Sequence, residues 1–171
     1  LGLGSLGKPT AKALNLLGFQ VHGWSRSEKE LSDISCYYGD DGLQKILATS
    51  EILIILLPLT KETFDIINHK TLSYMPKSAA LINAGRGGLI NDKALLESLK
   101  AGHLAHATLD VFNEEPLPPT HPYWLHPKVT VTPHIAADTV VETSSRSIAK
   151  NIQLIIQGGT PLGLVDTVRG Y

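Results

Sequence analysis

Three polar residues follow apolar segments of the sequence, and their types could together bind a carboxylate and transfer a proton. Arg86 lies in LINAGRGGLI, Glu115 in LDVFNEEPLPP and His134 in VTVTPHIAA. Arginine offers a fixed fork of donors, histidine exchanges a proton near neutral pH, and glutamate stabilises an imidazolium ion. Each residue alone has a plain alternative, as a surface charge, a loop carboxylate or a capped loop histidine. The hypothesis therefore requires that the fold bring all three together.

A glycine motif opens the chain. Gly2, Gly4 and Gly7 form G-x-G-x-x-G at the head of a predicted helix. In dinucleotide-binding folds the first glycine allows a tight turn, the second lets backbone approach a pyrophosphate, and the third permits close packing of helix on strand. The helix N-terminus adds N–H groups and the positive end of its dipole. A glycine-rich turn without a ligand would look the same, so the motif alone is a weak signal.

The segment after the next predicted strand indicates which dinucleotide would bind. NAD-binding proteins usually carry Asp or Glu there, about 20 residues past the glycines, to hold the ribose hydroxyls. Here the sequence reads Trp24-Ser25-Arg26-Ser27, without a carboxylate. Arg26 with two hydroxyl groups suits a 2′-phosphate. We therefore predict NADP(H), and we leave NAD(H) or a solvated basic turn as the alternatives.

These residues need a scaffold, and apolar segments typical of strands alternate with segments of helical periodicity. Continuous apolar runs such as residues 51–58 suit a parallel sheet that is covered on both faces. We expect helices over 8–18, 40–50, 68–75, 91–102 and 138–159, and strands over 19–24, 51–58, 79–83, 103–111 and 128–133. This order predicts an α/β fold, a Rossmann-like doubly wound parallel sheet with helices on both faces. Ligands bind at the carboxyl ends of such strands, where the three polar residues would meet.

Composition limits the classes of function. The 171 residues include 15 Lys and Arg against 16 Asp and Glu, a balance that gives no electrostatic reason to expect nucleic acid or an anionic membrane as partner. The longest apolar run, residues 52–57, is too short to span a bilayer. Cys36 is the single cysteine, which fits a reducing, cytoplasmic compartment. His103 and His106 lack a further Cys or acidic ligand, so we predict no metal site.

Five segments occur in the order and context of the D-2-hydroxyacid dehydrogenases: GLGSLG, LLPLT, INAGRGGLIND, LDVFNEEPLPP and VTVTPHIAA. The resemblance covers essentially the whole chain, and HGWSRSEK and VDTVRGY bring it closest to the NADPH-using branch that reduces glyoxylate and hydroxypyruvate. It implies that Arg86 orients the substrate, that His134 is the acid/base group and that Glu115 is its partner. The family glutamate directly precedes a proline, which selects Glu115 over Glu114.

The same resemblance implies further cofactor contacts. Asp110 resembles the family aspartate near the nicotinamide carboxamide, and Leu57-Pro58-Leu59-Thr60 resembles the loop that lines the adenosine side. The full set of predicted cofactor-binding residues is Gly2, Gly4, Ser5, Leu6, Gly7, Ser25, Arg26, Ser27, Leu57, Pro58, Thr63, Ala84, Gly85, Asp110 and His134. The implied partners are a small 2-oxo or 2-hydroxy acid substrate and a second copy of the chain in a homodimer.

The early position of the glycine motif bears on domain organisation. In the resembled family the nucleotide-binding domain is inserted into a substrate domain formed by an N-terminal segment and the final helix. We therefore expect residues 1–157 to form a dinucleotide-binding domain with a truncated first strand and without the N-terminal substrate domain, and residues 158–171 to form a tail that returns toward it. On this interpretation the chain is a fragment that binds nucleotide without turnover.

Two other functions stay open for the whole protein. One is a dehydrogenase of the same family that acts on a bulkier 2-hydroxy acid. The other is a nucleotide-sensing interaction module, because some relatives of this fold act as transcriptional corepressors.

Overall fold

The computed structural model describes residues 1–166 of the chain. The chain divides into two compact units, Leu1–His134 and Ile135–Tyr171. All predicted site residues belong to the first unit. The domain boundary expected at residue 157 falls inside the second unit, and as a statement about the whole protein it stays a prediction.

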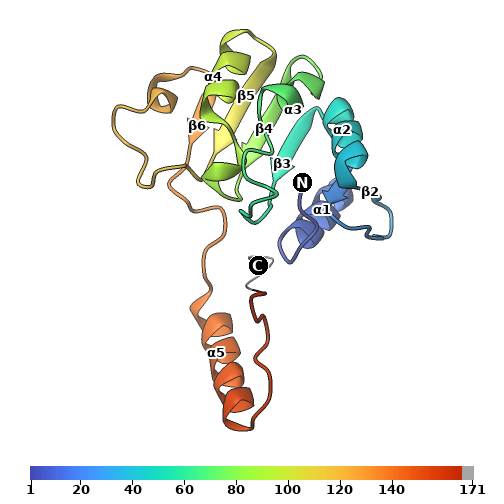
Figure 1. The fold of residues 1–171 in the computed structure, drawn as a ribbon, viewed down its shortest axis with the longest axis vertical. Coiled ribbons are helices and arrows are strands. Elements are labelled where there is room, and N and C mark those ends of the chain that lie inside the picture. Colours follow the sequence, from blue (N-terminus) through green and yellow to red (C-terminus); the bar gives the residue numbers. More distant parts are fainter. Residues whose placement is uncertain (167–171) are drawn as a thin grey trace. The chain divides into compact units, whose positions relative to one another are not determined.

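The first unit contains two parallel sheets (Figure 1). One pairs β1 (His22–Ser25) with β2 (Ser35–Tyr38), and the other contains, in this order, β3 (Ile52–Ile55), β4 (Ala79–Asn83), β5 (Leu104–Leu109) and β6 (Val129–Val131). Every neighbouring pair of strands is parallel. The predicted parallel α/β fold is confirmed, but β2 was not predicted, because its sequence SCYY buries no residue fully.

The first residues of the chain link the two sheets. The Leu1 amino group donates to the Ile54 carbonyl, Leu56 N–H donates to the Leu1 carbonyl, and Gly2 N–H donates to the Trp24 carbonyl. Leu1 and Gly2 therefore occupy the carboxyl end of a strand position between β1 and β3.

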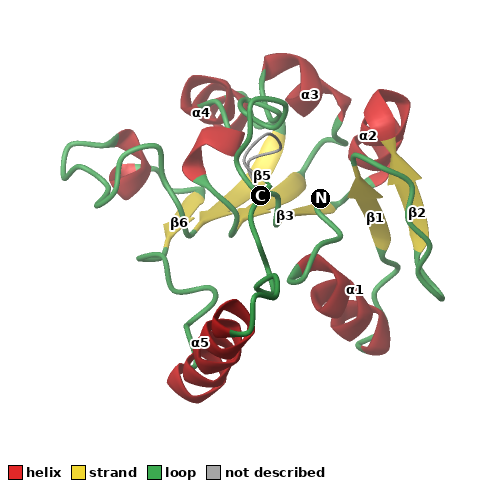
Figure 2. Ribbon diagram, turned by 60° about the horizontal axis from the view of Figure 1, so that its bottom comes forward, coloured by secondary structure: helices red, strands yellow, loops and turns green. Residues whose placement is uncertain are grey.

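Helices lie on both faces of the strands, as predicted (Figure 2). One face carries α2 (Gly39–Thr49), α3 (His69–Tyr74) and α4 (Asp92–Lys100), and the other carries α1 (Gly7–Leu16). Side-chain caps explain two of these starts. Asn68 accepts hydrogen bonds from two N–H groups of α3, and Asn91 accepts one from Ala94 of α4. Two short 3₁₀ helices, η1 (Gly87–Leu89) and η2 (Pro122–Leu125), interrupt the loops.

The main core of the first unit lies between the four-stranded sheet and the helices on its α4 face. Leu81, Leu95 and Leu104 have no solvent exposure, and they belong to one continuous apolar cluster. Burying each such side chain contributes about 1.5–3 kcal/mol. This core gives the loops at the carboxyl ends of the strands a rigid base.

The second unit contains α5 (Val141–Ile156) and the segment that follows it. No residue of α5 is buried, and Ile148, Ile152 and Ile155 follow one another at helical spacing. Asn151 holds the following segment through two hydrogen bonds with the backbone of Leu162, at 2.8 and 3.0 Å. Residues 167–171, which end the predicted tail, lie outside the described residues.

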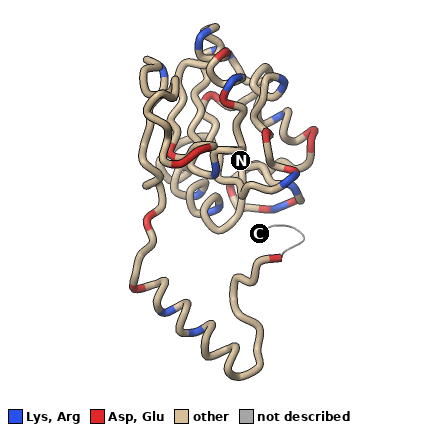
Figure 3. Tube along the Cα trace, turned by 60° about the vertical axis from the view of Figure 1, so that its left-hand side comes forward, with Lys and Arg blue, Asp and Glu red and all other residues tan. Residues whose placement is uncertain are grey.

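Charge is mixed along the described chain (Figure 3). Lys and Arg alternate with Asp and Glu over the first unit. Within residues 1–166 no helix combines the length and the apolar character needed to cross a membrane. Nor do any three His, Cys, Asp or Glu side chains in that range form a group able to hold a metal ion.

Candidate active site

The glycine turn, residues 2–7, has two positions that require glycine for internal reasons. Gly2 has φ +95°, and a Cβ there would lie 2.7 Å from the Leu56 carbonyl oxygen. A Cβ on Gly7 would lie 1.7 Å from the Gly2 carbonyl oxygen. By contrast, a Cβ on Gly4 would meet no atom within 4 Å. Gly4 therefore borders open space that a ligand can approach.

The start of α1 suits an anion. Its N-cap, Leu6, makes no side-chain hydrogen bond, and its first turn contains no acidic residue. Gly4, Ser5 and Leu6 are exposed just before the helix. N–H groups of a first helical turn have no partner within the helix, and the dipole favours negative charge there.

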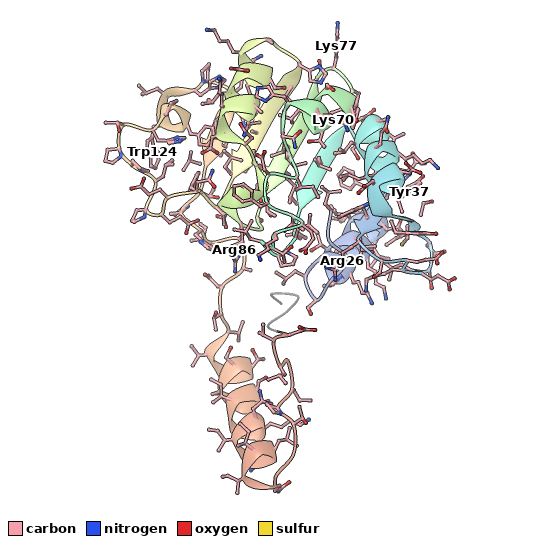
Figure 4. The ribbon with its side chains drawn as sticks, in the orientation of Figure 1. Arg26, Tyr37, Lys70, Lys77, Arg86 and Trp124 are labelled. Carbon is pink, nitrogen blue, oxygen red and sulfur yellow. The ribbon has the colours of Figure 1, made fainter. Side chains whose placement is uncertain are left out.

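The turn after β1 carries the predicted phosphate-binding residues. Ser25 is buried, and its hydroxyl donates to the Ser27 carbonyl at 2.7 Å, which shapes the turn. Arg26 is exposed between them (Figure 4). The pKa of Glu62 is lowered first by a hydrogen bond from Thr60 and further by the positive charge of Arg26, among others. The loop after β3 therefore lies within electrostatic reach of Arg26.

That loop contains the residues predicted to line the adenosine. Leu57 is buried, while the Thr63 hydroxyl donates to the Pro58 carbonyl at 2.7 Å and closes the loop. Thr60 and Thr63 make further hydrogen bonds across it, including one of 2.8 Å from Thr60 N–H to the Thr63 hydroxyl. The loop is thus held by its own threonines.

Asn83 ends β4 and organises the loop that carries Arg86. Its side chain is 1% exposed, donates to the Arg86 carbonyl at 3.0 Å and accepts from Gly85 N–H at 3.1 Å. A Cβ on Gly87 would lie 1.9 Å from the carbonyl carbon of Phe112, so this loop packs against the loop after β5. Sequence reasoning missed Asn83, although a polar residue at the end of the apolar segment AALIN was the signal.

Glu115 and His134 form a hydrogen-bonded pair. His134 Nδ1 lies 2.8 Å from Glu115 Oε2, and Phe112 N–H donates to Glu115 Oε1 at 2.9 Å. The pKa of Glu115 is lowered chiefly by the bond with His134, next by the bond from Phe112, and also by the charge of Arg86. Glu115 and His134 therefore meet, and the charge of Arg86 acts on the same carboxylate, while the catalytic roles of the three stay a prediction.

The backbone at His134 is unusual. Its φ is +56°, in the left-handed region that side chains with a Cβ rarely adopt. Its N–H donates to the Thr132 carbonyl at 3.1 Å, and the Thr132 hydroxyl donates to Asp110 Oδ1 at 2.6 Å. Asp110, 5% exposed at the end of β5, thus supports the segment that carries the histidine.

Comparison with known proteins decides the family. The profile described as D-isomer specific 2-hydroxyacid dehydrogenase, NAD binding domain, matches residues 1–136. This chain belongs to that family. All 171 residues align at 44% identity with a glyoxylate/hydroxypyruvate reductase A of Yersinia enterocolitica and at 44% with one of Serratia proteamaculans. The chain covers 55% of each, so it spans about half the length of these curated relatives.

Solved structures of the family have the same fold. A D-isomer specific 2-hydroxyacid dehydrogenase from Xanthobacter autotrophicus Py2, in complex with NADPH and MES, has a TM-score of 0.96 and 44% identity over 99% of this chain and 70% of that one. An NADPH-dependent glyoxylate/hydroxypyruvate reductase from Sinorhizobium meliloti, with NADP and sulfate, has a TM-score of 0.95 and 37% identity over 99% of this chain and 55% of that one. The predicted family and the Rossmann-like fold are confirmed.

Proposed function

We propose that this chain binds NADP(H), and that the whole protein uses it to reduce small 2-oxo acids such as glyoxylate and hydroxypyruvate. The observation that carries the proposal is the 2.8 Å contact of His134 with Glu115, within electrostatic reach of Arg86. The names of the Yersinia and Serratia relatives support the substrate class. The NADPH bound to the Xanthobacter protein supports the cofactor.

The open side of the glycine turn fits the pyrophosphate of a dinucleotide. Backbone N–H groups at Ser5 and Leu6 would face it, and Arg26 with Ser27 would hold the 2′-phosphate. The other predicted contacts would be Ser25 beside the phosphate, Leu57, Pro58 and Thr63 along the adenosine, and Ala84, Gly85 and Asp110 toward the nicotinamide. When bound, the nicotinamide supplies the hydride for C2 of the substrate.

The protein residues supply geometry, charge and a proton. Because Nδ1 of His134 faces Glu115, its Nε2 is the atom that donates a proton to the developing alkoxide. Glu115 has a lowered pKa and is therefore ionised at neutral pH, so its carboxylate is a hydrogen-bond acceptor that orients the His134 ring. The Arg86 guanidinium would bind the substrate carboxylate and orient the carbonyl.

Cofactor choice is tested on the 171-residue chain with Arg26→Ala. Loss of charge-assisted hydrogen bonds costs about 1.5–3 kcal/mol, so NADPH affinity should fall about 10- to 100-fold while NADH affinity changes little. Lys29→Ala is the matched control, since it removes a neighbouring positive charge with no assigned contact. Calorimetric titration measures both affinities, and equal losses for the two nucleotides would reject the phosphate assignment.

Turnover is tested in a chimera, the Yersinia relative with its matching segment replaced by this chain. We expect NADPH oxidation with glyoxylate and hydroxypyruvate. Faster turnover of a bulkier 2-oxo acid would favour the alternative dehydrogenase, and NADPH binding without any reduction would favour an interaction module. The 171-residue chain alone is the control, and we expect it to bind NADPH without turnover. Light scattering on the chimera tests the proposed homodimer.

A further inference from the structure

Glu115 lies on a loop, residues 112–126, that is attached to the rest of the unit at a point outside the site already described. Two side chains of this loop form hydrogen bonds with Asp92, the first residue of α4. Asn113 Nδ2 donates to Asp92 Oδ2 at 2.9 Å, and the Tyr123 hydroxyl donates to Asp92 Oδ1 at 2.8 Å. The two oxygens of one carboxylate therefore hold the loop on either side of Glu115.

The Tyr123 attachment is mostly buried. Tyr123 is 2% exposed, and burial first, then the charge of Asp92, raise the pKa of its hydroxyl, so it remains a donor. His121 adds to the contact, since its Nδ1 accepts from Tyr123 N–H at 3.3 Å and its Nε2 lies 3.9 Å from Asp92 Oδ2. Removing the carboxylate would leave a buried hydroxyl without its partner, an unfavourable state that the loop would relieve by moving.

The base of this attachment is rigid. Asp92 follows the N-cap Asn91, where a negative charge is favourable to the helix. Leu95 and Leu99, on the same helix, have no solvent exposure. Movement of Asp92 relative to the sheet would therefore disturb the core.

We propose that Asp92 is a positioning residue: by holding Asn113 and Tyr123 it places the Glu115 carboxylate against the imidazole of His134. The catalytic meaning of this placement rests on the proposed function. The placement itself does not depend on the proposed function, because it concerns a contact between two side chains in the chain without ligand. The loop thereby couples the start of α4 to the proton-transfer pair.

The pKa of Glu115 reports whether the carboxylate is in place. The His134 imidazole, the Phe112 N–H and the charge of Arg86 all lower this pKa. If the loop is released, these contacts weaken and the pKa rises toward its ordinary value. Removing the negative charge of Asp92 by itself would act in the opposite direction and lower that pKa further. The sign of the change therefore separates positioning from direct electrostatics.

The experiment is an NMR titration of the Glu115 carboxyl in the 171-residue chain without nucleotide, with Glu115→Gln to assign the signal. In Asp92→Ala we expect the pKa to rise toward the value measured in His134→Ala, with a smaller rise in Asp92→Asn, which keeps an acceptor for Tyr123. Asp41→Asn is the matched control, because Asp41 also lies in the first turn of a helix but belongs to α2. A folded Asp92→Ala chain whose Glu115 pKa is unchanged or lower would overturn the proposal.

A second variant covers the case in which Asp92→Ala fails to fold. Asn113→Ala combined with Tyr123→Phe removes both attachments and keeps the charge of Asp92. We expect the same rise in the Glu115 pKa, and an unchanged value in the folded double variant would also overturn the proposal. In the chimera the double variant should lower kcat about tenfold with NADPH affinity unchanged, as expected for misplaced catalytic groups. Because the titration needs no substrate, it stays decisive if the proposed reaction is wrong.

Discussion

The glycine turn and the Glu115–His134 pair lie in one unit but are held by different forces. At Gly2 and Gly7 of the turn, backbone excludes a side chain, since a Cβ on Gly7 would lie 1.7 Å from a carbonyl oxygen. At the pair, side chains that are 37% and 49% exposed meet through a hydrogen bond. A substitution at Gly2 or Gly7 should therefore decide whether the turn forms, whereas a substitution in the pair should alter chemistry and leave the fold intact.

The largest effect is expected for Gly7→Ala. The new methyl group meets backbone, which cannot move aside cheaply, so we expect the free energy of unfolding to fall by about 3 kcal/mol or more. Urea unfolding followed by circular dichroism measures this. Gly4→Ala is the control, because the space at Gly4 is open: it should keep its stability but lose NADPH affinity. Equal stability of the two variants would contradict the contrast.

An effect on catalysis, and none on stability, is expected for His134→Ala in the chimera. Loss of the proton donor should lower kcat by about 10²- to 10⁴-fold while the thermal midpoint and NADPH affinity stay unchanged. His69→Ala provides the control, since His69 makes an equally short 2.8 Å contact with Glu97 away from the site. If kcat fell equally in both variants, His134 would have no special role.

The smallest effect concerns pH. Because folding lowers the pKa of Glu115, its ionised carboxylate stabilises the folded state at pH values above the ordinary pKa of 4.5. This stabilisation is lost as the pH falls through the lowered pKa of the folded chain. We expect Glu115→Gln to reduce the dependence of stability on pH in the acid range, and only slightly, because the pair is partly exposed. Urea unfolding at about pH 6 and about pH 4 compares the two chains. A pH dependence unchanged by the substitution would show that the bond adds nothing to stability.

The regular core elements were predictable because local sequence patterns specify them. β3 and β4 are continuous apolar segments, and α4 combines a cap, helical spacing and a terminal glycine. β2 was missed because a short strand whose side chains are partly exposed has no such pattern. The two 3₁₀ helices were missed because they depend on how the loops pack.

The site was partly predictable for a topological reason. Arg86, Glu115 and His134 each follow a predicted strand, and parallel strands end at one edge. The choice of Glu115 over Glu114 came from the resemblance, and it is the Glu115 carboxylate that contacts His134. The contacts of Asp92 were not predictable, since they join residues 21 and 31 positions apart through the path of a loop.

The left-handed backbone of His134 bears on the history of this chain. Glycine and asparagine adopt φ near +56° more readily than most residues. Histidine is itself enriched there among residues with a Cβ, so selection for a stable domain alone would favour only glycine over the imidazole. A descendant that carries Gly at this position, with the glycine motif intact, should bind nucleotide without catalysing the reaction.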